Sequence, residues 1–121
     1  MAVILVVEDD FFIREYAETM IANWGHQIHS ASDLPEALAF LRSSRPIDAV
    51  FTDVYLKAET HGGCDLARQA ILLRPGLRIL YTTGNRATDA LQAQFPAGTH
   101  FLAKPYTEDQ LGASVRRLLA A

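Results

Sequence analysis

ILVVEDDFF, residues 4–12, joins four apolar residues to three consecutive acids and then to two phenylalanines. The apolar run at 3–7 is continuous and does not alternate with polar residues, which is typical of a parallel strand covered on both faces. At 11–24 the apolar residues follow a helical period, and Gly25 stands where a helix C-cap glycine is expected. The stretch therefore predicts a buried strand, an acidic turn and a helix, in that order.

Strand and helix patterns continue to alternate in the next part of the chain. The short polar run at 26–31 predicts a second strand at or near a sheet edge. Ser32 is expected to cap the helix that follows, with Pro35 in its first turn. A third strand is expected around Asp48 to Thr52.

The second half of the chain has the same alternation. A helix with aligned Leu66 and Ala70 precedes a fourth strand that ends in YTTG, and RATDALQAQF predicts a weakly apolar fourth helix. THFLAKP predicts a fifth strand, and Thr107 is expected to cap a final helix. Because crossovers between parallel strands are right-handed, five such units predict an α/β fold: a doubly wound five-stranded parallel sheet with five helices.

Composition limits the class of protein. The 121 residues predict a single domain, 1–121, without an output domain, and one cysteine excludes an internal disulfide. A net charge of -3 without a run of Lys or Arg argues against a nucleic-acid surface. The apolar N-terminus is short and lacks a basic flank, so neither a signal peptide nor a membrane span is expected, and the expected location is cytoplasmic.

Reactive side chains follow four of the five predicted strands. They are Glu8, Asp9 and Asp10 after the first strand, Asp53 after the third, Thr82 and Thr83 at the end of the fourth, and Lys104 at the end of the fifth. Because the carboxyl ends of parallel strands share one edge of a sheet, these side chains are expected to meet there. Two carboxylates about 5 Å apart repel by roughly 3 kcal/mol, and one lysine cannot neutralise three of them. A hard divalent cation, Mg²⁺ or Mn²⁺, is therefore expected, while Asp10 is assigned to the start of the first helix.

The motifs ILVVEDD, DAVFTD, YTTG and HFLAKPY, in this order and over essentially the whole chain, resemble the receiver domain of two-component response regulators. The resemblance implies a flavodoxin-like sheet with strand order 2-1-3-4-5. It also implies a phosphoacceptor in a phosphorelay, which receives its phosphoryl group from a histidine kinase or phosphotransfer protein. Such a protein is not a conventional enzyme, because it catalyses only its own phosphorylation and dephosphorylation.

The resemblance assigns roles to single residues of the metal and acceptor site. Asp53 falls where receivers carry the phospho-accepting aspartate. Glu8 and Asp9 match the acidic pair that holds Mg²⁺ together with the acceptor, and the carbonyl of Tyr55 would supply a further oxygen.

Other matched positions belong to the switch. Thr83 matches the hydroxyl that hydrogen-bonds the phosphoryl group, and Lys104 matches the lysine that pairs with it. The peptide bond to Pro105 is typically cis in the family. Phe101 matches the aromatic switch position on the fifth strand.

The resemblance also implies a partner surface, formed by the fourth helix, fifth strand and fifth helix around Arg86, Phe101 and Tyr106. An unidentified downstream protein is expected there, and the chain itself is expected to be a monomer or a weak dimer through the same surface. Tyr55 and Asn85 match positions that tune dephosphorylation. The chain departs from the family in the loop from Lys57 to Gly63, where Lys57 replaces the usual proline.

Three other interpretations remain beside the receiver. One is a receiver-like interaction module that is not regulated by phosphorylation. A second is an aspartate-nucleophile phosphohydrolase, which commonly uses a second acid two residues after the nucleophile, where this chain has Tyr55. The third is a flavodoxin-like cofactor binder, whose first loop would have to accept a phosphate that Glu8 and its neighbours repel.

Overall fold

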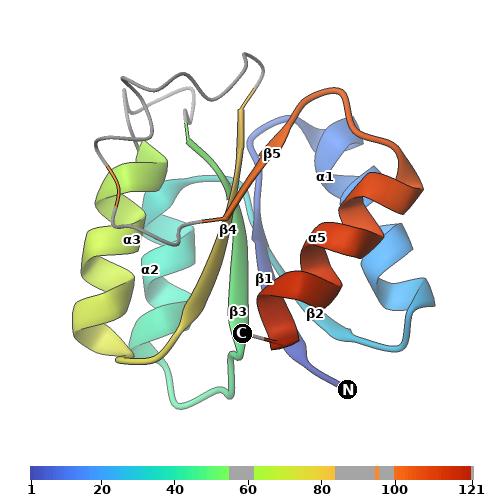
Figure 1. Cartoon of the computed structure of the whole chain (residues 1–121). Coiled ribbons are helices and arrows are strands. Elements are labelled where there is room, and N and C mark those ends of the chain that lie inside the picture. Colours follow the sequence, from blue (N-terminus) through green and yellow to red (C-terminus); the bar gives the residue numbers. More distant parts are fainter. Residues whose placement is uncertain (55–61, 84–94, 96–99, 121) are drawn as a thin grey trace.

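A computed structural model of the chain describes residues 1–54, 62–83, 95 and 100–120. Five parallel strands form one sheet in the order β2-β1-β3-β4-β5, which confirms the expected strand order (Figure 1). The strands are β1 (Val3–Val7), β2 (Gln27–Ala31), β3 (Ala49–Asp53), β4 (Arg78–Thr83) and β5 (His100–Ala103). The described helices are α1 (Phe11–Asn23), α2 (Leu34–Arg42), α3 (Gly62–Leu73) and α5 (Glu108–Ala120). The fourth helix expected from RATDALQAQF lies almost wholly outside the described residues.

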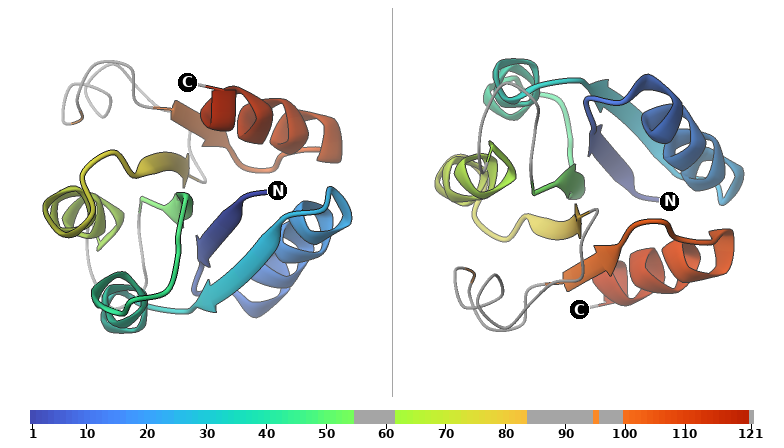
Figure 2. Two further views of the ribbon diagram at one scale, coloured as in Figure 1. Left: turned by 90° about the horizontal axis from the view of Figure 1, so that it is seen from below. Right: turned by 90° about the horizontal axis from the view of Figure 1, so that it is seen from above.

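Helices cover both faces of the sheet (Figures 1 and 2). One core cluster joins Ile4 and Val6 of β1 to residues of α1 and α5, and a second joins Leu5 and Val7 to residues of α2 and α3. These four β1 side chains are at most 1% exposed. Burying a side chain of this size contributes roughly 1.5–3 kcal/mol, so the continuous apolar run is what a two-faced strand requires.

The start of α1 is fixed by Asp10, as expected. Its Oδ1 accepts hydrogen bonds from the backbone N–H of Phe12 at 2.9 Å and of Ile13 at 3.1 Å. Gly25 follows the other end of α1 with φ +90°, a left-handed conformation that favours glycine. Asp10 is therefore occupied by the helix start, which separates it from the other two acids of the turn.

The expected cap of α2 at Ser32 is wrong. Asp33 is the N-cap residue, and its Oδ1 accepts from Glu36 N–H at 2.9 Å, while Glu36 Oε1 accepts from Ser32 N–H at 3.0 Å. A cap at Ser32 would place Pro35 at the third helical position, where the cap hydroxyl needs an N–H that proline lacks.

Two further boundaries follow from local hydrogen bonds. The expected cap of α5 is confirmed, because Thr107 Oγ1 accepts from Gln110 N–H at 3.1 Å and Gln110 Oε1 accepts from Thr107 N–H at 2.9 Å. The third strand begins one residue later than expected, at Ala49, and Asp48 joins it to β1: its N–H donates to the Val3 carbonyl at 2.8 Å, and its carboxylate accepts from the Val3 N–H at 2.7 Å. In the part of the chain that the structure describes, no helix is long and apolar enough to span a bilayer.

Candidate functional site

The carboxyl ends of β1 and β3 bring three carboxylates together. In the register of these neighbouring strands Val7 lies opposite Thr52, so Glu8 and Asp53 follow side by side. One carboxylate oxygen from each of Glu8, Asp9 and Asp53 lies within 4.8 Å of the other two. Glu8 is 4% and Asp53 is 7% exposed, so these charges are held at the rim of the core with little water around them.

Lys104 reaches this cluster from the end of β5, two strands away from β3. Its Nζ donates to Asp53 Oδ2 at 2.7 Å and to Glu8 Oε1 at 2.5 Å. Its backbone N–H bonds the carbonyl of Thr83 at 2.8 Å, which fixes the start of the loop after β5. The next peptide bond, Lys104–Pro105, is cis, the geometry that the resemblance implies. One ammonium group thus joins the acids of two different strands.

The site remains electrically unbalanced. Burial raises the pKa of the Glu8 carboxyl above its ordinary value, and the hydrogen bond from Lys104 offsets only part of that effect. For Lys104, burial alone would lower the pKa, but the hydrogen bonds to Asp53 and Glu8 outweigh burial and raise it. The ammonium is therefore held charged, and it faces three carboxyl groups, so the acidic groups of the cluster outnumber its one cation.

The chemistry of these donors fits a hard divalent cation. Three carboxylates from two strands provide oxygen ligands only, and their spacing lets a single ion contact all of them. Glu8, Asp9 and Asp53 would hold such an ion, which would supply the positive charge that one lysine cannot. The fourth expected ligand, the carbonyl of Tyr55, lies outside the described residues.

Thr83 ends β4 next to this cluster. Asp53 lies opposite Thr82 in the sheet, so Thr83 is one residue further toward the carboxyl edge, and it is 1% exposed. Because side chains alternate along a strand, the two threonines point to opposite faces of the sheet. Asn85 and Arg86, the other expected site residues after β4, lie outside the described residues.

Phe101 and Tyr106 pack in different clusters. The Phe101 ring stacks on Tyr81 with 5.6 Å between centroids and meets Phe95 edge-on at 5.1 Å. Tyr106 packs against the opposite core cluster, 6.0 Å from the ring of Phe51. Tyr106 therefore packs with residues of α1 and α5 and not with the rings around Phe101, and its place in a partner surface stays a prediction.

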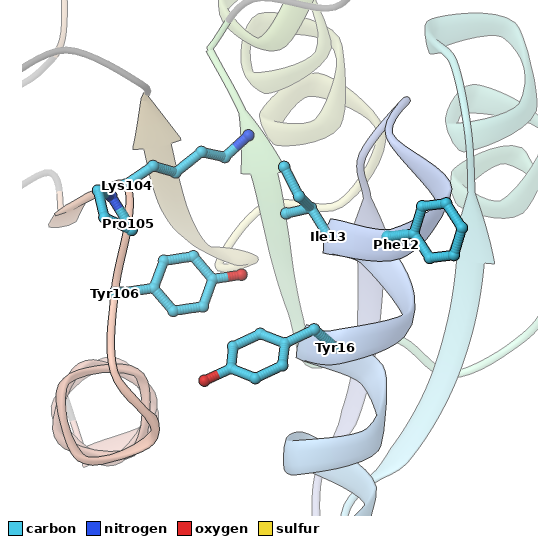
Figure 3. Close-up of a pocket in the computed structure, with 6 residues that line it drawn as sticks. All are labelled: Phe12, Ile13, Tyr16, Lys104, Pro105 and Tyr106. Atoms are coloured by element: carbon cyan, nitrogen blue, oxygen red, sulfur yellow. The ribbon is translucent and has the colours of Figure 1, made fainter.

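An apolar pocket opens beside the ion pair, between α1 and the loop after β5 (Figure 3). It has a volume of about 460 Å³ and is lined by Phe12, Ile13, Tyr16, Lys104, Pro105 and Tyr106. Phe12 is 80% and Tyr16 is 48% exposed at its rim. The sequence interpretation missed this pocket, because a sequence does not show that Phe12 and Tyr16 stay exposed once α1 has packed on the sheet.

Comparison with known proteins gives one family. The model of the response regulator receiver domain matches residues 4–116. The response regulator MprA of Mycolicibacterium vanbaalenii is 34% identical over 117 residues, which cover 96% of this chain and 49% of that protein. MprA of Mycobacterium avium is 33% identical over the same length, covering 96% of this chain and 50% of that protein. The chain spans about half the length of the curated relatives it matches.

Solved structures give the same fold. A response regulator receiver protein from Sinorhizobium medicae superposes with a TM-score of 0.88 at 27% identity, covering 99% of this chain and 95% of that one. NtrX from Brucella abortus superposes with a TM-score of 0.87 at 28% identity, covering 98% of this chain and 27% of that one.

Proposed function

The chain belongs to the response regulator receiver family of two-component signalling, and we propose that its Asp53 accepts a phosphoryl group from a phosphohistidine of a partner kinase or phosphotransfer protein. The observation that carries this proposal is the convergence of Glu8, Asp9, Asp53 and Lys104 at one edge of the sheet. Repulsion among three acids that share one lysine lowers the stability of the fold, so a purely structural role does not account for the cluster.

The reaction exchanges one bond to phosphorus for another. A carboxylate oxygen of Asp53 attacks the phosphorus, the bond from phosphorus to the histidine nitrogen breaks, and its electron pair stays on the imidazole. Nucleophile and phosphoryl group are both anionic, so catalysis consists of positioning and charge neutralisation. The Lys104 ammonium lies 2.7 Å from Asp53 Oδ2, so it can pair with the oxygens of the phosphoryl group as that group is transferred. A bound Mg²⁺, held by Glu8, Asp9 and Asp53, would neutralise carboxylate and phosphoryl charge together.

The phosphorylated site would act on the residues beside it. An aspartyl phosphate adds negative charge and acceptor oxygens next to Thr83, whose hydroxyl is a hydrogen-bond donor. Inward movement of Thr83 would alter the chain after β4 and the packing of Phe101 in its aromatic cluster. The downstream partner surface is proposed to include Phe101 and the segment after β4, in which Arg86 lies.

The phosphodonor protein would approach over the apolar pocket of Figure 3. The pocket adjoins Lys104, so a side chain bound there would bring its protein next to Asp53. Phe12 and Tyr16 expose apolar area that binding would remove from water, which favours association.

The test is phosphorylation by a small phosphodonor such as acetyl phosphate, read by intact mass. We expect one adduct in the presence of Mg²⁺ and none with a chelator. Asp53→Asn should remove the adduct, whereas Asp10→Asn, which changes an acid of the same turn that caps α1, should retain it. An adduct that persists in Asp53→Asn would refute the assignment of the acceptor.

Failure with the small donor is resolved by a second experiment with the cognate kinase. No adduct from either source would favour the interaction module that phosphorylation does not regulate. Continuous release of phosphate from a phosphomonoester substrate would instead favour the phosphohydrolase.

A further inference from the structure

The last turn of α3 exposes apolar side chains far from the acidic cluster. Ile71, Leu72 and Leu73 are 46%, 81% and 42% exposed, although Leu66 and Ala70 of the same helix are fully buried. The inner face of α3 is therefore already packed. Successive residues of a helix do not share a face, so these three side chains do not form one surface. Leu73 alone of the three lines a groove that leads to the end of α2.

A shallow groove connects this turn to the end of α2. It has a volume of about 660 Å³ and is lined by Leu41, Arg42, Ser43, Ser44, Arg45, Pro46, Leu73 and Arg74. The two helices pack side by side, with their carboxyl ends at the edge of the sheet opposite to the acidic cluster (Figure 1). We call its exposed residues Arg42, Arg45, Pro46 and Leu73 the α2–α3 surface.

The arginines at this end of the molecule have different roles. Arg74 is structural, since its guanidinium donates to the carbonyls of Leu41 at 3.1 Å and Ser43 at 2.7 Å and so closes the end of α2. Arg42 and Arg45 are exposed, and neither closes the end of α2 as Arg74 does. The Arg45 guanidinium lies 5.6 Å from the Phe40 ring centroid. Arg42 interacts favourably with the dipole of α2, but Arg45 lies beyond the helix, where the dipole does not explain it.

The charge here is opposite to that of the chain as a whole. The net charge of the chain is -3, yet the residues lining this groove include Arg42, Arg45 and Arg74 and no carboxylate. The neighbouring groove adds Arg78 and one acid, Asp48. Carboxylates gather instead at the far edge of the sheet. The α2–α3 surface is thus complementary to a ligand that is acidic and apolar together.

We propose that the α2–α3 surface binds an acidic amphipathic helix of a partner protein. Leu73 and Pro46 match the apolar stripe of such a helix, and Arg42 and Arg45 match the acids beside that stripe. Nucleic acid fits less well, because a phosphate backbone leaves Leu73 and Pro46 without an apolar partner and the lining residues of the groove include no aromatic side chain. The surface lies away from Asp53, so the proposal does not depend on phosphorylation.

The probe is a fluorescein-labelled peptide of about 20 residues, with leucine at helical spacing and glutamate elsewhere, measured by fluorescence anisotropy. Two control peptides replace either every glutamate by lysine or every leucine by serine. We expect binding of the first peptide alone, weakened by salt because charge contributes to it. No saturable binding of the acidic amphipathic peptide, or equal binding of all three, would overturn the proposal.

Variants locate the contact. Arg45→Glu and Leu73→Ser should each weaken binding by about tenfold, since each removes a contact from a small surface. Arg117→Glu is an equal charge reversal on exposed α5, and Ile71→Ser removes an exposed apolar side chain of α3 that does not line the groove; each should change binding less than about twofold. Binding that is insensitive to Arg45→Glu and Leu73→Ser would refute the assigned surface, and tighter, equally sensitive binding of a single-stranded oligonucleotide would assign it to nucleic acid. Asp53→Asn should bind the peptide like the parent, so a failure of the phosphorylation experiment leaves this test unaffected.

Discussion

Removal of the Asp9 carboxylate should stabilise the metal-free protein. Glu8 and Asp53 both bond Lys104, so a change of either loses an ion pair as well as a charge. Asp9→Asn removes one of the three mutually repelling charges and leaves both of those ion pairs in place. It is therefore the substitution that most directly measures the repulsion in the cluster.

The magnitude follows from the spacing of the oxygens. Two unit charges 4.8 Å apart repel by about 3.5 kcal/mol at an effective dielectric constant near 20, and by about 0.9 kcal/mol in bulk water. Asp9 is half-buried, so its repulsion lies between these limits, and part of it is compensated by interactions that asparagine loses. We expect Asp9→Asn to raise the free energy of unfolding by about 1–2 kcal/mol in a chelator, or Tm by about 3–8 °C.

Saturating magnesium should make the parent more stable than Asp9→Asn. At a thousand times its Kd, a ligand that binds only the folded state adds about 4.1 kcal/mol to the parent, more than the gain expected from the substitution. Asp9→Asn has lost one of the proposed ligands, so its stability should respond much less to Mg²⁺. The assay is urea unfolding followed by circular dichroism, with and without Mg²⁺.

The matched control is Glu15→Gln, which removes one negative charge from an exposed position of α1 outside the cluster. Its free energy of unfolding should change by less than about 0.5 kcal/mol. If Asp9→Asn were no more stable than the parent in chelator, or responded to Mg²⁺ like the parent, the description of the cluster as an unbalanced cation site would be incorrect.

Three further results are expected. Burial raises the pKa of Glu8, so the folded state binds its proton more tightly than the unfolded state, and Glu8 destabilises the metal-free protein progressively as the pH rises from 4.5 through the raised pKa. The free energy of unfolding of Glu8→Gln relative to the parent should therefore rise over that interval in urea titrations at several pH values. A constant difference would contradict the assigned pKa. Tyr106→Phe should stabilise the protein by about 1 kcal/mol in urea unfolding, since the buried hydroxyl has no hydrogen-bond partner among the described residues. Burial, with nearby carboxylates, also raises the pKa of this hydroxyl. A loss of stability would show that the hydroxyl does have a hydrogen-bond partner. Arg74→Met should lower the free energy of unfolding by about 2–3 kcal/mol through the lost hydrogen bonds to the carbonyls of Leu41 and Ser43, while phosphorylation by acetyl phosphate stays intact. A change below about 0.5 kcal/mol would show that this guanidinium does not stabilise the end of α2.

Local signals predicted most of the fold. The continuous apolar run of β1 indicated burial on two faces, and Asp10 was assigned to the helix start because the helix dipole favours acids there, a local effect. Capping preferences gave Thr107 correctly and placed the cap of α2 one residue early, at Ser32 in place of Asp33, because the missing N–H of Pro35 was weighed only as a small cost in the first turn and not as a donor that the Ser32 hydroxyl needs.

The chemical identity of the site was also contained in the sequence. Parallel strands end at one edge of a sheet, so the residues that follow β1, β3, β4 and β5 had to lie near one another. The sequence alone therefore determined which side chains meet, and that one lysine faces three acids.

Tertiary structure alone decided which surfaces those side chains and their neighbours form. Lys104 bonds both Glu8 and Asp53, and Tyr106 turns inward and away from Phe101, because the path of the loop after β5 depends on packing against α1 and β3. The exposure of Leu72 was equally invisible, since a helical period shows that one face is apolar but not which apolar residues the neighbouring helix leaves uncovered. Contacts between neighbours in the chain can be read locally, whereas contacts between distant elements exist only once the sheet and its helices have assembled.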